Sequence, residues 1–317
     1  MTAAHALPPE LLRENHPFRQ WKTWTVPGTR LTVTGYSRSN DKTFFHLPEL
    51  RACIDAGQCA GRRPDTVLLT HTHDDHATDL EYLAGKDPAA DLYVPAEAEA
   101  YISAFIRAKR EMNQVAAYDP ARAGSYRLHG VRPDDTFDLL GGRYRVRVVP
   151  CVHKVPCVGY AFSEVRKRLK PEFEKLKSEL GAGFGKRMAE ARKAGESPEE
   201  VYDAPLFVFM GDTHPAAFAL APWVLDYPVV FTECTFLSDA EKERADKAGH
   251  TVWSALRPVV EARPQTLFVL THFSLRHSDR EVVVFFEKVR KAGVENIVPW
   301  AHADSFLPEL HQRSGEE

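Results

Sequence analysis

The chain has 317 residues, of which 44% are hydrophobic and 27% are charged, and its formal net charge is -3. This composition is typical of a globular protein with a substantial core, and it argues against wholesale binding to nucleic acid or to a membrane. The first twenty residues lack the apolar core of a signal peptide, and no apolar run reaches the ~20 residues that span a bilayer. The five scattered cysteines contain no Cys-X-X-Cys pair, which favours reduced thiols in a cytoplasmic protein.

Runs of β-branched and aromatic residues recur along the chain and predict strands. We expect these strands at 31–34, 43–47, 67–70, 91–94, 144–149, 158–162, 206–210, 229–232, 267–271 and 296–298. Helical patterns occupy 95–112, 238–248, 252–262 and 278–291, and the last opens with Ser278 and Glu281 spaced as a capping box. Early strands follow one another and later strands alternate with helices, which suits sheets sandwiched between helical layers.

A polar, helix-prone stretch at 164–203 interrupts this series. Its first part is basic, with Arg166, Lys167, Arg168 and Lys170 close together, and its middle at 181–185 is rich in glycine. Such a charge run fits a solvated helical excursion. It fits equally well an arm that projects from the domain to bind a polyanion through these basic residues. The sequence leaves both interpretations open.

The most informative segment is Thr-His-Thr-His-Asp-Asp-His at 70–76, directly after an apolar run. Residues two apart on an extended segment point to the same side, so His71 and His73 can bind one metal ion. A turn into a helix would then direct Asp75 and His76 toward a second ion. Imidazole and carboxylate are the ligands that zinc-like divalent ions choose, and the pattern predicts a binuclear site rather than a solvated polar loop.

Three further residues of the metal-ligand type stand at the ends of later strand-like runs. These are His153, Asp212 in a Gly-Asp-Thr sequence, and His272 in a Thr-His-Phe-Ser sequence. A strand end is a rigid position that can fix the geometry of a ligand. Each residue alone would suit a hydrogen-bonded structural role, but together with the 70–76 segment they form a strong candidate site.

These motifs, in this order over about residues 30 to 300, resemble the metallo-β-lactamase fold superfamily and, within it, the ribonuclease Z (tRNase Z) family. The resemblance rests on 70–76, 153–160, 211–213, 232–236, 249–251 and 271–276, and the segments 35–37 and 47–57 are most similar to the plant short forms. It implies an α/β fold, an αββα sandwich with two mixed β-sheets between helical layers. The expected organisation is a single domain over 1–317 with a helical arm-like insertion at about 164–203.

Carried over position by position, the resemblance implies two divalent metal ions, expected to be Zn²⁺. It assigns one ion to His71, His73 and His153 and the other to Asp75, His76 and His272, with Asp212 bridging. It implies catalytic roles for Asp75, Glu233 and His250, the last two as a couple that protonates a departing 3′-oxygen. The implied reaction is two-metal phosphodiester hydrolysis that cleaves the 3′ trailer from precursor transfer RNA. The implied partners are this RNA, no membrane and, because family members are often homodimers, a second copy of the chain.

Two departures from the family pattern leave the substrate open. The glycine- and proline-rich arm of many bacterial members and their Pro-X-X-Arg-Asn-like loop are not evident. One alternative is therefore a hydrolase of the same fold that acts on a small phosphodiester, thioester or lactone, in a pocket closed by 164–203. The other is a metal-dependent RNA-binding protein without significant catalysis, against which the complete set of ligand positions argues.

Overall fold

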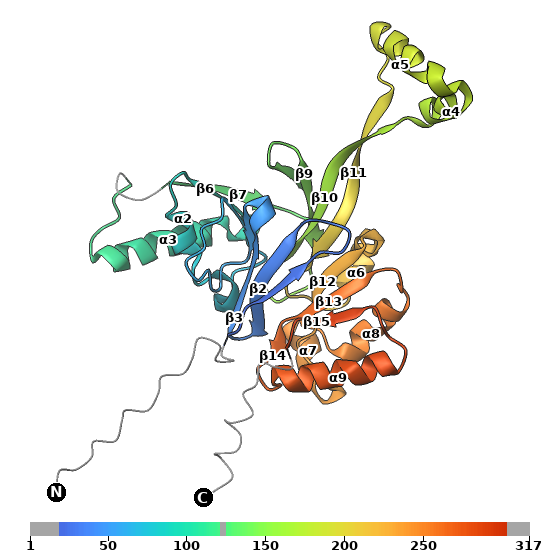
Figure 1. The fold of residues 1–317 in the computed structure, drawn as a ribbon. Helices are drawn as coiled ribbons and strands as arrows, with labels where there is room; N and C mark the ends of the chain where they lie inside the picture. The colour runs from blue at the N-terminus through green and yellow to red at the C-terminus, as the bar shows by residue number, and fades with distance from the viewer. Residues whose placement is uncertain (1–18, 121–124, 303–317) are drawn as a thin grey trace, which may run out of the picture.

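The computed structural model describes residues 19–120 and 125–302, and in these residues two mixed β-sheets pack face to face between helices (Figure 1). The first sheet contains, in spatial order, β1 (Lys22–Thr25), β2 (Thr32–Ser39), β3 (Lys42–Leu47), β4 (Ala52–Ile54), β5 (Thr66–Leu68), β6 (Ala90–Pro95) and β7 (Tyr126–Val131), and β14 (Phe273–Ser274) pairs with β2. The second contains β15 (Ile297–Pro299), β13 (Leu267–Thr271), β12 (Val229–Glu233), β11 (Glu199–Phe209), β10 (Val158–Leu169), β9 (Tyr144–Pro150) and β8 (Thr136–Leu139).

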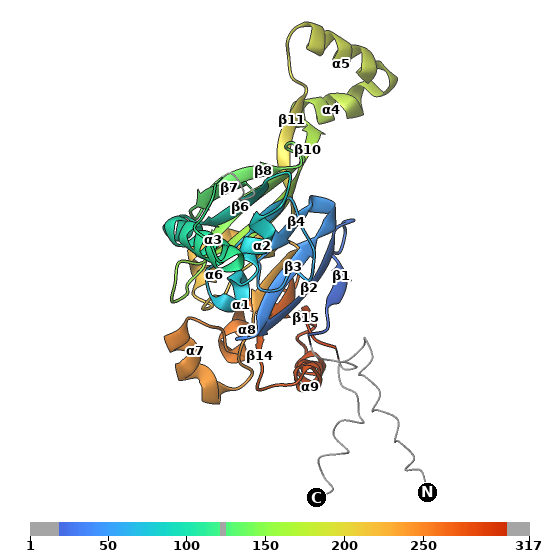
Figure 2. The ribbon, with the colours of Figure 1, turned by 90° about the vertical axis from the view of Figure 1, so that its left-hand side faces the viewer.

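Helices cover the outer faces of both sheets. Helices α2 (Leu80–Ala84) and α3 (Glu99–Gln114) lie over the first sheet, and α6 (Ala217–Leu220), α8 (Trp253–Glu261) and α9 (Asp279–Lys291) lie over the second (Figures 1 and 2). The short α1 (Asp74–Ala77) and α7 (Lys242–Ala248) lie at one end of the sandwich (Figure 2). Short 3₁₀ turns are η1 (Pro48–Leu50), η2 (Ala96–Ala98), η4 (Pro222–Asp226) and η5 (Asp239–Glu241). The predicted αββα sandwich is confirmed.

The apolar side chains form a core between the sheets and one under each helical layer. Between the sheets, the ring of Phe45 lies 4.9 Å from that of Phe209 and 6.3 Å from that of Phe231. Ile106 of α3 is buried against the first sheet, and Phe286 of α9 is buried against the second. Both faces of the central strands are therefore covered, which explains why their sequences read as continuous apolar runs.

Each expected strand overlaps an observed one, and the predicted capping box begins α9. The hydroxyl of Ser278 accepts the amide of Glu281, and the Glu281 carboxylate accepts the amide of Ser278. The sequence did not predict β1, β4 and β14, which are at most four residues long, nor β7 and β8, whose side chains are largely exposed or half-buried. The exposure of β7 and β8 explains their lack of an apolar run.

The stretch at 164–203, which we call the arm, differs from the helical excursion that its sequence suggests. Strands β10 and β11 pair antiparallel from Tyr160 and Phe209 out to Leu169 and Glu199, so both ends of the arm are strands. Helices α4 (Pro171–Leu180) and α5 (Phe184–Lys193), with the turn η3 (Gly181–Gly183) between them, form its tip, which projects from the body (Figures 1 and 2). The helical expectation for 164–169 is wrong because backbone pairing with β11 extends that segment.

Candidate metal centre

The predicted metal ligands gather where four strands end. His71 and His73 follow β5, His153 follows β9, Asp212 follows β11, and His272 follows β13; Asp75 and His76 belong to α1. The backbone is extended at His73 (φ -62°, ψ 148°) and becomes helical from Asp74. Because the backbone changes direction here, His71 and His73 point toward one group of candidate ligands, and Asp75 and His76 point toward a second group.

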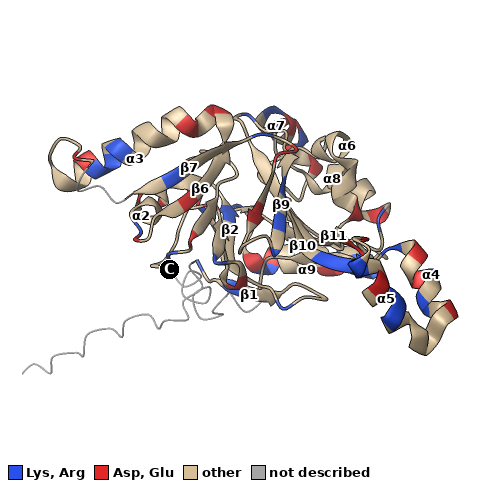
Figure 3. Cartoon of the chain, turned by 90° about the horizontal axis from the view of Figure 1, so that it is seen from above, with Lys and Arg blue, Asp and Glu red and all other residues tan. Residues whose placement is uncertain are grey.

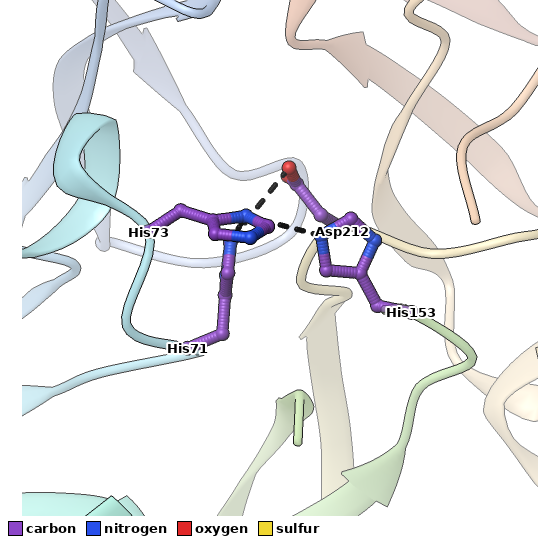
Figure 4. A group of neighbouring side chains, drawn as sticks. All are labelled: His71, His73, His153 and Asp212. Carbon is purple, nitrogen blue, oxygen red and sulfur yellow. Dashed lines mark hydrogen bonds and ion pairs between the residues drawn. The ribbon is translucent and has the colours of Figure 1, made fainter. Parts of the chain in front are cut away.

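The first group consists of three imidazoles and one carboxylate that point toward one another (Figure 4). His73 Nδ1 lies 3.0 Å from His71 Nε2 and 3.2 Å from His153 Nε2. Asp212 Oδ2 lies 3.8 Å from His71 Nε2. Two ligands bound at about 2.0–2.1 Å to one tetrahedral ion lie about 3.4 Å apart, so this spacing fits a single metal ion.

The second group shares Asp212 with the first. His272 Nε2 lies 3.4 Å from His76 Nε2 and 3.4 Å from Asp75 Oδ2. Asp212 Oδ1 is 3.5 Å from His76 Nε2, and its Oδ2 is 3.3 Å from His272 Nε2. One carboxylate oxygen or the other therefore reaches each group, which is the geometry of a bridging ligand.

Hydrogen bonds fix the orientation of four of the imidazoles. In each, Nδ1 donates to a nearby oxygen: the Thr70 hydroxyl for His71, the Asp55 carboxylate for His76, the Gly249 carbonyl for His153 and the Thr235 hydroxyl for His272. Both hydroxyls can accept this bond because each donates its own proton to a carboxylate. Each ring therefore keeps its Nε2 lone pair directed at the other ligands, as metal-binding histidines require.

Asp55 is a functional candidate that the sequence analysis did not assign. Its side chain is fully buried, and it accepts both the amide and the hydroxyl of Thr70 at 2.8 Å and His76 Nδ1 at 2.7 Å. The available signal was a lone carboxylate between apolar residues at a strand end. Such a residue is rarely buried without partners.

The charges of these groups suit divalent cations. Burial would raise the pKa of Asp75, but the hydrogen bond to His272 and the charge of His76 lower it to about 2. Burial likewise opposes ionisation of Asp212, yet His272 and His76 hold its pKa well below the usual range. Burial lowers the pKa of His71, which keeps this ring neutral. Burial would also lower the pKa of His76, but Asp212 and Asp55 raise it, and a bound cation would displace the Nε2 proton of His76. Ionised carboxylates and neutral imidazoles are the forms that bind metal.

A buried carboxylate–imidazole couple lies beside this cluster. Glu233 Oε1 accepts His250 Nδ1 at 2.8 Å and the amide of Thr213 at 2.8 Å, and Oε2 accepts the amide of Thr251 at 3.1 Å. His250 Nδ1 is also 3.9 Å from Asp212 Oδ2. Burial lowers the pKa of His250, but Glu233 and Asp212 together raise it, to about 9. His250 is therefore protonated on both ring nitrogens at neutral pH, next to the predicted metal ligands.

The cluster and the couple open into one cavity of about 550 Å³. Its lining includes His73, Asp75, His153, Asp212, His250 and His272. No residue of the arm contributes to it. The cavity brings a group of metal-binding type and a proton donor within reach of one bound molecule.

Residues 48–170 match the beta-lactamase superfamily domain model. The chain carries a beta-lactamase superfamily domain. It is 26% identical to the chloroplastic tRNase Z TRZ2 of Arabidopsis thaliana over 278 residues, which cover 84% of this chain and 74% of that protein. It is 28% identical to a ribonuclease Z of Pyrobaculum arsenaticum over 224 residues, 68% of this chain and 69% of that protein.

Structural similarity agrees with this domain assignment. Zinc-bound PqqB from Methylobacterium extorquens superposes with a TM-score of 0.50 at 13% identity, with 85% of each chain covered, and this likeness shows the fold. The resemblance predicted from the sequence is confirmed, and the protein is a metal-dependent hydrolase of the metallo-β-lactamase type. None of the helices within 19–120 and 125–302 combines the length and hydropathy that crossing a bilayer demands.

The predicted RNA-binding residues lie apart from the metal centre. Arg166, Lys167 and Arg168 are on β10, and Lys170 precedes α4 at the tip of the arm. Two of the four are already ion-paired, because Arg166 contacts Glu164 at 2.6 Å and Arg168 contacts Glu200 at 2.7 Å. A role in binding substrate would therefore fall mainly to the two lysines.

Proposed function

We propose that the protein is an endoribonuclease that cleaves the 3′ trailer from precursor transfer RNA at a two-zinc centre. The observation that carries this proposal is the Glu233–His250 couple next to Asp212. Hydrolysis of a thioester or lactone has no departing 3′-oxygen that would need such a proton donor. The relatives named tRNase Z and ribonuclease Z support the choice of substrate.

The donor set fits two zinc ions. One ion would be bound by His71, His73 and His153 and the other by Asp75, His76 and His272, with Asp212 between them. Bound there, zinc supplies a Lewis acid for the phosphate and lowers the pKa of the attacking water.

The side chains of the protein act at the two ends of the reaction. A water oxygen forms a bond to phosphorus while the bond from phosphorus to the 3′-oxygen breaks. Asp75 orients this water and receives its proton, and His250 gives its own proton from Nε2 to the 3′-oxygen. Glu233, fixed by backbone amides, holds the imidazole in place. The products are a 3′-hydroxyl on the RNA body and a 5′-phosphate on the trailer.

The shape of the site argues against the small-molecule alternative. That alternative expects the arm to close the pocket, whereas the arm projects away and lines no part of the cavity (Figure 1). An RNA-binding protein without catalysis would have no use for a buried couple such as Glu233 and His250. Both observations favour a large substrate that is cleaved.

The test is incubation of the zinc-loaded protein with a 3′-extended transfer-RNA precursor and, separately, with a small phosphodiester. We expect a mature RNA ending in a 3′-hydroxyl. His73→Ala should abolish cleavage, and His129→Ala, which alters a histidine paired with Asp91 outside the cavity, should not. Hydrolysis of the small phosphodiester without cleavage of the precursor would contradict the proposed substrate. Two bound metals without turnover of either would favour the binding-protein alternative.

The organisation and setting of the enzyme are part of the same proposal. We take the chain to be one hydrolase domain with the arm as its insertion. Assembly as a homodimer and a cytoplasmic location stay predictions, to be checked by the molar mass in solution and by cell fractionation.

A further inference from the structure

A second cavity, of about 370 Å³, adjoins the metal centre on the side of His250. We call it the α7 pocket because α7 supplies two of its basic residues. The basic side chains of its lining are Lys154, Arg244, Lys247 and Arg276. Ser39, Asn40, Lys154, Ala248 and His250 line both cavities, so the α7 pocket opens directly into the metal centre.

The charge of the α7 pocket is positive and largely uncompensated. In the part of the chain that the structure describes, no carboxylate lines it, and Arg276 alone of its four cations is ion-paired, with Glu241. Lys154, Arg244 and Lys247 have no ion-pair partner among residues 19–120 and 125–302. Uncompensated cations around an open cavity attract an anion.

The arm differs in this respect, although its sequence begins with a basic run. Between residues 164 and 203 it carries ten Lys or Arg and nine Asp or Glu. Residues of both signs occur along the ribbon of the arm (Figure 3). The concentrated positive charge that borders the metal centre is therefore that of the α7 pocket.

The proposed reaction determines which part of the RNA lies there, and this step rests on the proposed function. His250 protonates the 3′-oxygen of the nucleotide upstream of the cut, so that nucleotide lies against His250. The pocket that continues from His250 then receives the phosphate on the 5′ side of the same nucleotide. Leu275, which is 57% exposed, and Phe236 add apolar surface for its base or ribose.

We propose that the α7 pocket binds the backbone phosphate immediately upstream of the scissile one, with Arg244 and Lys247 as its main partners. Binding there holds the departing 3′-oxygen at His250. The pocket thereby favours an RNA chain over a small phosphodiester, which has no second phosphate to offer.

The test compares charge reversals in the zinc-loaded, full-length protein. Lys247→Glu and Arg244→Glu alter the pocket, and Lys242→Glu makes the same charge change on the same helix outside it. We expect the first two to lower the ratio of kcat/KM for a 3′-extended RNA to that for bis(p-nitrophenyl) phosphate at least ~10-fold, and the control to lower it less than about twofold. In a plot of the logarithm of the RNA-binding constant against the logarithm of the salt concentration, the slope should become shallower by about 0.7 for each phosphate contact that is lost.

A modified substrate identifies the phosphate. An RNA with a neutral methylphosphonate just upstream of the scissile phosphate should lose at least ~10-fold in kcat/KM with the unaltered protein. Lys247→Glu should then lose little more, because the interaction is already absent. The proposal is overturned if the neutral linkage costs nothing, if the two losses add in full, or if Lys242→Glu matches Lys247→Glu.

Failure of the proposed function would be recognised separately. In that case the unaltered protein hydrolyses bis(p-nitrophenyl) phosphate and leaves RNA intact. The uncleaved RNA would then be used as an inhibitor of that hydrolysis. Inhibition that Lys247→Glu weakens and Lys242→Glu does not would retain the α7 pocket as an RNA phosphate site, and equal inhibition of all three proteins would overturn it.

Discussion

Replacing Asp55 with asparagine is expected to weaken one zinc site and leave the fold intact. Asp55 Oδ1 accepts the amide of Thr70, which can only donate, so the asparagine oxygen has to remain on that side. The new amide NH₂ then faces His76 Nδ1, where a donor already stands. To avoid two facing donors, His76 has to move its proton to Nε2, and this removes the lone pair that points at the ligand group.

The expected magnitude follows from this inversion. Loss of the hydrogen-bond partner behind a metal ligand typically weakens metal affinity ~10–100-fold, or about 1.4–2.8 kcal/mol. In Asp55→Asn the His76 ring loses its partner and is also driven into the opposite tautomer. We therefore expect a loss of metal affinity at the upper end of this range, about 100-fold. Asparagine has the size of aspartate, so no cavity forms and the protein should remain folded.

Zinc titration against a chromophoric chelator measures this directly. We expect the site that contains His76 to weaken and the site that contains His71 and His73 to keep its affinity. Asp65→Asn is the matched control, because Asp65 pairs with Arg51 and with Lys86 rather than with a ligand. Two unchanged binding steps in folded Asp55→Asn, or an equal loss in the control, would refute the reasoning.

Glu233→Gln removes the charge that holds the proton on its imidazole partner, and single-turnover cleavage of RNA is expected to slow about 10²–10⁴-fold with metal content unchanged. Charge reversal at Lys167 and Lys170 should raise KM for RNA and flatten its salt dependence if the arm binds RNA, and unchanged values would leave the arm a solvated excursion. Burial would raise the pKa of Asp279, but Lys22 and Arg38 together lower it, so the ionised carboxylate stabilises the fold above its ordinary pKa of 3.8. That stability is lost as the pH falls through the lower folded value, and urea unfolding of Asp279→Asn should lack this part of the acid dependence.

The grouping of the predicted metal ligands at one end of the sandwich could be anticipated because their signals are local. His71 and His73 stand two apart after an apolar strand, and His153, Asp212 and His272 each follow another one. Strands β11, β12 and β13 are parallel, and β9 runs in the same direction because both it and β11 are antiparallel to β10. The carboxyl ends of these strands therefore lie at the same end of the sandwich. Asp55 could not be predicted in the same way, because its role depends on a contact with His76 that forms only when β4 and β5 pair side by side.

The arm and the α7 pocket are two features that local sequence patterns could not predict. Beyond Val165 the strands that carry the arm leave the sandwich, so no alternation of apolar and polar residues marks them. Their pairing continues from the buried halves of β10 and β11. The α7 pocket joins Lys154, Arg244 and Arg276 from three distant segments, and only the fold reveals that they share a cavity.

The hairpin that carries the arm joins two predicted metal ligands, since β10 starts shortly after His153 and β11 ends shortly before Asp212. Closing a free loop between them would cost entropy, but here the strands pair from their base outward and hold the ends together. The cost of a longer tip rises only slowly with its length, by about 0.6 kcal/mol for each doubling. The tip can therefore be lengthened, shortened or exchanged during evolution without disturbing the coordination sphere. Recognition of the substrate and cleavage chemistry are thereby free to diverge independently within one chain.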